Sequence, residues 1–222
     1  LGDAMSDHSA EGRIAVGAGP YTLACDNFDV IVTGNSAHAA KPSDGVDAIA
    51  VACSMVTELQ KIVAREIDPY DPLVVSVTGI EGGGAYNVIA PEVRLKGTIR
   101  SGREETRQKA WQRLRQVFEG IAAAHGAHVA VDIRRGEPAV VNDPEMVDIV
   151  QRAGAAIVGR DNVQTAPGWT AADDFAFYSE KCPSVYFRLG IRNADIDAVY
   201  PLHHPKFSID ETALPKGAMV LA

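Results

Sequence analysis

The chain has 222 residues, of which 46% are hydrophobic and 23% charged. This is the composition of a folded globular protein, with room for one large domain or two small ones. Its 21 Lys and Arg against 29 Asp and Glu give a formal net charge of −8, and the sequence has no basic run. Both features argue against nucleic acid and anionic membranes as partners. No apolar stretch approaches the roughly 18 residues that span a bilayer, and the first residues carry no signal-peptide pattern.

The three cysteines, Cys25, Cys53 and Cys182, are odd in number, far apart and form no C-x-x-C pair. This pattern argues against a disulfide framework or a cysteine-built zinc site, and it favours a reducing, cytoplasmic location. We expect each cysteine to be a small buried hydrophobic residue.

Residues 28–135 alternate between strand and helix patterns. Runs that are rich in β-branched residues or that alternate in polarity predict strands at 28–32, 73–78, 93–99 and 129–133. Helical periodicity predicts one helix over about 44–65 and another between the last two strands. The order β-α-β-β-α-β is that of the ferredoxin-like plait, in which two helices cover one face of an antiparallel sheet.

Each predicted helix carries an apolar stripe that we expect to face the core. The stripe of the first helix comprises Ile49, Cys53, Val56, Leu59 and Val63. The stripe of the second comprises Ala110, Leu114, Val117, Phe118 and Ile121. Residues 101–104 have the S-x-x-E spacing of a capping box before the second helix, and Gly126 is suited to end it.

The flanking segments indicate a second domain that is only partly present. Asp143 and Pro144 predict the start of a helix that ends at Gly159. A short helix at 171–180, a buried strand at 184–189 and a last helix after residue 211 are expected to follow. Residues 13–16 are strand-like but have no obvious pairing partner. The last helix stops at residue 222, and fewer than about 12 helical residues are marginal alone.

A histidine among small residues follows the first predicted strand, in residues 34–42 (GNSAHAAKP). Small neighbours would leave the imidazole of His38 uncovered, and the strand would determine where it points. His38 therefore either presents a hydrogen-bonding ring to a ligand or is an ordinary surface histidine.

Glycines 82–84 precede Asn87 between two predicted strands. Gly83 and Gly84 would let backbone N–H groups approach a ligand closely, and Asn87 would bind a polar group of a substrate. The alternative is a flexible hairpin connection in which Asn87 caps the turn. The segment is not a phosphate loop, because the G-x-x-x-x-G-K-[ST] pattern is absent.

Arg100 ends the third predicted strand, where a guanidinium can bind a carboxylate through two parallel hydrogen bonds or simply be solvated. His203 and His204 are adjacent. In an extended segment their side chains would point in opposite directions, so only one could face a given metal.

Five motifs occur in order along the chain: GNSAHAAKP at 34–42, GGAYNVI at 83–89, GTIR at 97–100, ADDF at 172–175 and LHHPKF at 202–207. Together they resemble the metal-dependent amidohydrolase family of aminoacylases, hippurate hydrolases and auxin-conjugate hydrolases, from about Gly12 onward. The resemblance implies an α/β fold in which a ferredoxin-like α+β lid, which also forms a homodimer, is inserted in a zinc-peptidase-like catalytic domain. Residues 28–135 would be the lid, 136–222 the C-terminal part of the catalytic domain, and 1–27 a remnant of it.

The resemblance also implies roles for single residues. His38 would be catalytic, reaching the active site of the opposite subunit to stabilise the oxyanion. Asn87 and Arg100, together with Gly83 and Gly84, would bind the substrate, and Arg100 would hold its carboxylate. His203 would be a metal ligand. Asp173 stands where the family usually has glutamate, so its role is open.

The family's N-terminal segment, with most metal ligands and a glutamate general base, has no counterpart in this sequence. His8 is the nearest candidate for the metal histidine before the lid, but its spacing to Gly12 is wrong. The implied activity is hydrolysis of N-acyl amino acids with two divalent metal ions, zinc or manganese. This chain would be an incomplete portion of that enzyme and inactive alone. The alternatives are a non-catalytic dimerisation or ligand-binding module, and a free-standing ligand or RNA binder, which the acidic charge disfavours.

Overall fold

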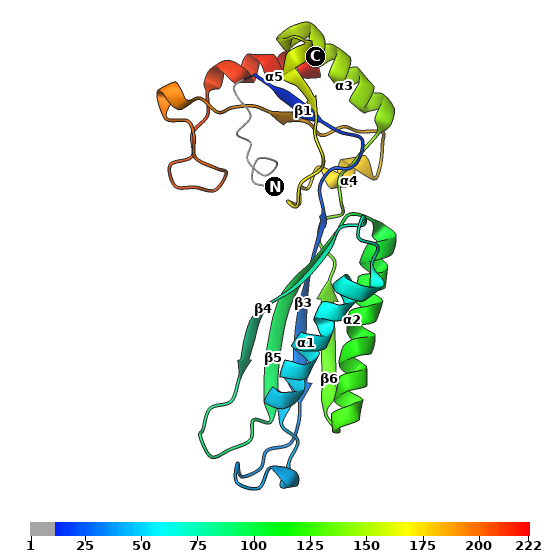
Figure 1. The fold of residues 1–222 in the computed structure, drawn as a ribbon, viewed down its shortest axis with the longest axis vertical. Coiled ribbons are helices and arrows are strands. Elements are labelled where there is room, and N and C mark those ends of the chain that lie inside the picture. The colour runs from blue at the N-terminus through cyan, green and yellow to red at the C-terminus, as the bar shows by residue number, and fades with distance from the viewer. Residues whose placement is uncertain (1–11) are drawn as a thin grey trace. The chain divides into compact units, whose positions relative to one another are not determined.

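The computed structural model describes residues 12–222, which form two compact units (Figure 1). One unit is Ala24–Pro138, and the other combines residues 12–23 with 139–222. His8 lies outside the described residues. Within them, no helix has the length and apolar character needed to cross a membrane.

The Ala24–Pro138 unit is a four-stranded antiparallel sheet with two helices on one face (Figure 1). Its strands and helices are β3 (Ala24–Thr33), α1 (Ala48–Glu66), β4 (Leu73–Gly82), β5 (Glu92–Ser101), α2 (Glu104–His125) and β6 (His128–Arg134). The sheet order is β4-β5-β3-β6, and every neighbouring pair is antiparallel. The predicted order of strands and helices is the observed one, although β3, β4 and β5 are longer than expected.

The core of this unit lies between the sheet and the two helices. Each fully buried Val, Leu, Ile or Phe side chain contributes about 1.5–3 kcal/mol. The predicted buried face of α1 was right in part: Leu59 is fully buried and Val56 and Val63 pack against the core. Ile49, which is 40% exposed, and Cys53 do not face the core. The buried residues of α1 are Ala48, Val51, Ala52, Met55, Leu59 and Ile62.

Helix α2 buries the predicted stripe but begins differently from the prediction. Ala110, Leu114 and Phe118 are fully buried, and Gly126 ends the helix in the left-handed conformation with φ 69°. The capping box was a wrong prediction, because the N-cap is Arg103 and no side chain caps the helix. Ser101 is instead the last residue of β5, held in register with β3 and β4.

The second unit contains a small mixed sheet and short helices. Strand β1 (Ile14–Val16) lies between β8 (Val163–Thr165), to which it is parallel, and β9 (Arg188–Leu189), to which it is antiparallel. These pairings supply the partners that the sequence of residues 13–16 did not reveal. A two-stranded sheet pairs β2 (Gly19–Pro20) with β7 (Val141–Asn142).

Helix α3 (Pro144–Val158) begins as predicted, with the Asp143 carboxylate accepting hydrogen bonds from the N–H groups of Glu145 and Met146. The predicted helix at 171–180 shortens to α4 (Ala176–Ser179), and the predicted strand at 184–189 shortens to β9. Short 3-10 turns at Arg160–Asn162, Ala194–Ile196 and Glu211–Ala213 join these elements, the last leading into α5 (Leu214–Leu221).

The cysteines do not fit the expectation that each is buried. All three are free thiols; Cys53 and Cys182 are exposed and Cys25 is partly buried.

Candidate functional site

The segment that carries His38 is held on both sides by backbone hydrogen bonds. On one side, Asn35 and Val46 form an antiparallel bridge with two N–H···O bonds of 3.0 Å. On the other, His38 and Val88 form a bridge flanked by bonds of 2.9 Å from Ala39 N to Asn87 O and from Ile89 N to Ala37 O. The histidine therefore projects from a constrained backbone rather than from a loose loop.

Two glycines make this arrangement possible. A Cβ on Gly34 would lie 2.1 Å from the carbonyl oxygen of Val46, and one on Gly45 would lie 2.6 Å from that of Asn35. Real Cβ atoms do not approach so closely, so only glycine fits at these positions.

The imidazole of His38 is exposed and held in one tautomer. Its Nδ1 accepts a 3.1 Å hydrogen bond from the N–H of Ala40, so Nδ1 carries no proton in the neutral ring. The proton of the neutral ring then resides on Nε2, which is left as a hydrogen-bond donor. This is the geometry needed to offer a neutral N–H group to a ligand oxygen.

The glycine-rich loop lies beside His38, as the structure pairs residues 87–89 with 37–39. Gly83 has φ +78°, a left-handed value that favours glycine, and Gly84 faces open space. Residues 83–88 are exposed. The structure therefore brings His38, Asn87, Gly83 and Gly84 to one end of the sheet.

Arg100 does not lie at that end. The register pairs Thr33, just before the His38 segment, with Glu92, whereas Arg100 pairs with Cys25 at the start of β3. At about 3.4 Å per residue, roughly 27 Å of strand separates Glu92 from Arg100. One small ligand cannot contact both His38 and Arg100 of the same chain.

His203 lies in the other unit, in an exposed turn. It has a positive φ of 66°, rare for a residue other than glycine. The premise of an extended segment at 202–205 was therefore wrong. His204 stacks on Tyr200 with ring centroids 4.7 Å apart, and its Nδ1 accepts a 3.1 Å hydrogen bond from Lys206 N. These contacts engage His204 locally and involve neither ring nitrogen of His203.

The residues present do not by themselves build a metal centre. Within residues 12–222, no three His, Cys, Asp or Glu side chains lie close enough together to hold a metal ion. A zinc site needs three or four protein ligands, so His203 would supply one ligand of a larger set. Asp173 is engaged locally, accepting bonds from Phe175 N at 2.9 Å and from the Tyr186 hydroxyl at 3.2 Å.

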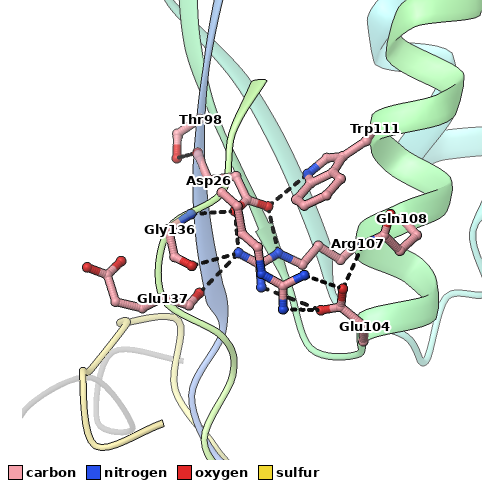
Figure 2. A network of polar contacts seen from close by, with 9 residues as sticks. Asp26, Thr98, Glu104, Arg107, Gln108, Trp111, Gly136 and Glu137 are labelled. Atoms are coloured by element: carbon pink, nitrogen blue, oxygen red, sulfur yellow. Dashed lines mark hydrogen bonds and ion pairs between the residues drawn. The ribbon is translucent and has the colours of Figure 1, made fainter. Parts of the chain in front are cut away.

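A buried polar network supports the end of the sheet where Arg100 lies (Figure 2). Asp26 and Arg107 are both fully buried and form an ion pair. Asp26 also accepts hydrogen bonds from Trp111 Nε1 at 2.8 Å and from Gly136 N at 3.0 Å, while Arg107 donates to Gly136 O at 3.0 Å. The network joins the beginning of β3, helix α2 and the segment after β6.

The surroundings of Arg107 and Glu104 favour their charged forms. Burial alone would lower the pKa of Arg107, but its hydrogen bonds and charge interaction with Asp26 raise the pKa above its usual value. Burial would likewise raise the pKa of Glu104, yet hydrogen bonds from Gln108 and Arg135 hold it below the usual range. The sequence motifs did not predict this network. A signal was present, because Arg107 lies one turn before Ala110, on the buried apolar face of α2, where a charged residue needs a partner.

Comparison with known proteins relates most of the chain to hydrolases. Residues 26–126 match the peptidase dimerisation domain family. The chain is 34% identical to thermostable carboxypeptidase 2 of Saccharolobus solfataricus, covering 98% of this chain and 55% of that protein. It is 33% identical to N-acetylcysteine deacetylase of Bacillus subtilis, covering 95% and 54%.

A solved structure extends the likeness to the fold. The Bacillus subtilis YXEP protein, described as a dinuclear metal binding peptidase from the M20 family, superposes with a TM-score of 0.78 at 29% identity, covering 96% of this chain and 52% of that chain. The chain spans about half the length of the curated relatives it matches. It belongs to the M20 family of amidohydrolases and peptidases.

Proposed function

We propose that this chain is part of an enzyme that hydrolyses the amide bond of N-acyl amino acids, as aminoacylases and hippurate hydrolases do. The observation that carries the proposal is His38, exposed on a constrained backbone with its Nδ1 accepting the Ala40 N–H, which leaves Nε2 as the donor of the neutral ring. The name of one relative, a deacetylase of N-acetylcysteine, supports this substrate class.

In this proposal residues 28–135 are a ferredoxin-like lid and dimerisation domain. Residues 1–27 and 136–222 belong to a zinc-peptidase-like catalytic domain. The match of residues 26–126 to a dimerisation domain supports a homodimer as the working form. The free thiols support a cytoplasmic location.

His38 would act as an oxyanion donor. When an amide is attacked, its carbonyl carbon becomes tetrahedral and its oxygen gains negative charge. A neutral imidazole whose Nε2–H is fixed before the reaction stabilises that charge without reorganising. Loss of one such donor typically lowers kcat by about 10²–10³-fold, or about 2.7–4 kcal/mol.

Arg100 and Asn87 would bind the rest of the substrate. Arg100 would hold the carboxylate of the amino acid through paired hydrogen bonds, and Asn87 would contact the amide region beside His38. Because His38 and Arg100 lie at opposite ends of one sheet, we place them in two different active sites. The His38 of one subunit would then serve the site bounded by Arg100 of the other.

The proposal includes two divalent metal ions per active site, zinc or manganese, because a similar solved structure is described as a dinuclear metal binding peptidase. The described residues offer only His203 toward them, so the other ligands would come from elsewhere in the protein.

The proposal is tested on the protein in the length that its gene encodes, with N-acetyl and N-benzoyl amino acids as substrates. We expect hydrolysis that a chelator abolishes, and a loss of about 10²–10³-fold in kcat for His38→Ala. The control is His125→Ala, which removes an exposed histidine at the C-terminal end of α2. Equal turnover with and without chelator would refute the metal requirement. A dimer that binds these compounds without hydrolysing them would favour a binding module instead.

A further inference from the structure

Val88 is the residue directly opposite His38. The hydrogen bonds on either side of the pair run from Ala39 N to Asn87 O and from Ile89 N to Ala37 O. This pattern makes His38 and Val88 a non-hydrogen-bonded antiparallel pair, the type in which Cα atoms lie only about 4.5 Å apart. Side chains of such a pair lie next to each other on the same face.

The backbone at Val88 is held firmly enough to orient a neighbour. Val88 N donates to Ala85 O at 3.4 Å, and Ile89 N donates to Ala37 O. The Ser36 hydroxyl donates to Ile89 O at 3.2 Å. Three separate hydrogen bonds thus tie the Val88 segment to itself and to the His38 segment.

No residue next to His38 in sequence is large enough to restrict the imidazole, since Ala37, Ala39 and Ala40 carry only methyl groups. Val88 is branched at Cβ and therefore stiff at χ1. It remains 44% exposed although it is apolar, which is the environment expected for a side chain that flanks an exposed ring.

We infer that Val88 is a positioning residue, which holds the imidazole of His38 so that Nδ1 stays on the Ala40 N–H and Nε2–H faces outward. One face of the ring is then covered by Val88, and its only free polar atom is the donor. The catalytic consequence rests on the function proposed above, whereas the orientation of the ring does not.

The orientation is tested by NMR of the protein in the length that its gene encodes, with ¹⁵N-labelled histidine, the His38 signals being assigned with His38→Gln. We expect the wild type to show His38 in the Nε2–H tautomer. Val88→Ala should move its two nitrogen shifts toward a tautomer average, and Val88→Ile, which keeps the β-branch, should preserve them. Val141→Ala is the matched control, since Val141 is 48% exposed and lies in the other unit.

The kinetic effect is measured on the full-length enzyme with an N-acyl amino acid. Val88→Ala should lower kcat about tenfold with little change in KM, because misplacing a donor affects the transition state more than the ground state. Val88→Ile should restore kcat.

The outcomes separate this inference from the proposed function. If Val88→Ala matches Val141→Ala in both NMR and kinetics, the positioning role is overturned. An Nδ1–H tautomer in the wild type would overturn it as well. If the tautomer shifts with Val88→Ala but His38→Ala leaves turnover unchanged, the positioning role stands and the proposed function fails.

Discussion

The ion pair of Asp26 and Arg107 shows at the scale of single residues how this chain uses buried charge. Desolvating two ions is costly, and their attraction offsets that cost only when the remaining hydrogen-bonding groups are satisfied. Here Trp111, Gly136 and Glu137 supply partners (Figure 2). The pair therefore holds three separated segments in one arrangement.

Removing one partner should be much more costly than losing an exposed pair. Arg107→Met leaves Asp26 buried without its counter-charge and should lower the free energy of unfolding by about 3–5 kcal/mol. Arg134→Ala removes an ion pair with Asp29 whose side chains are 63% and 47% exposed, and it should cost less than about 1 kcal/mol. Urea unfolding followed by fluorescence of Trp111, in a Trp169→Phe background, reports this unit. Equal losses for the two variants would contradict the reasoning.

Residue-level features were predictable where they depend on near neighbours in sequence. The Asp143 cap and the Gly126 stop require only local geometry, and both are present. The exposure of His38 followed from its small neighbours. The Asp26–Arg107 pair was not predictable in the same way, because 81 positions separate its members and only the fold brings them together. The turn at His203 was not predicted, because a positive φ is expected from the sequence mainly at glycine and this position is a histidine.

At the scale of elements, Gly97 determines how β5 packs on its neighbours. A Cβ there would lie 2.2 Å from both Phe28 Cζ and Ser76 O. The glycine of the GTIR motif thus makes room for the fully buried ring of Phe28. Its presence in the motif has a packing cause, independent of any role in substrate binding.

Gly97→Ala should therefore destabilise the Ala24–Pro138 unit by about 1–3 kcal/mol through overpacking. Gly120→Ala is the matched control, because no atom lies within 4 Å of a Cβ at that position in α2. There the change should stabilise by about 0.5–1 kcal/mol, since alanine favours the helix interior. Thermal unfolding of the two variants compares these effects, and a neutral Gly97→Ala would show that Phe28 relaxes freely.

Element order followed from the sequence because hydrophobic period separates strands from helices. The buried faces and the lengths of the helices and strands were predicted less well from the sequence. Helix α1 has apolar residues on several sides, so its stripe did not specify which of them meets the core. Strand β4 continues past an irregularity between Val77 and Gly79, beyond the run of β-branched residues on which the shorter prediction depended. In the second unit, β8 and β9 are very short. Their bounds depend on pairing with β1 and cannot be read from their amino-acid composition.

At the scale of the whole molecule, the two edges of the four-stranded sheet differ. On β6, Arg115 Nη1 donates to Val131 O at 2.7 Å, and the strand carries charged residues that discourage further pairing. On β4, Ile80 is 55% exposed. It borders a groove of about 480 Å³ that residues of β4 and α1 line: Cys53, Val56, Thr57, Val77, Thr78, Gly79 and Ile80. If the chain forms the homodimer proposed above, we expect its contact to lie along the β4 edge.

A two-fold contact along β4 would use the same surface of both subunits, so each substitution in it acts twice. Ile80→Asp should bring two like charges into a desolvated contact, costing several kcal/mol, or more than about a hundredfold in the dimer Kd. His128→Asp alters the β6 edge, and Ile149→Asp alters an exposed isoleucine of α3 in the other unit. Both should leave the dimer intact in sedimentation equilibrium. A dimer that survives Ile80→Asp but dissociates with His128→Asp would move the contact to β6.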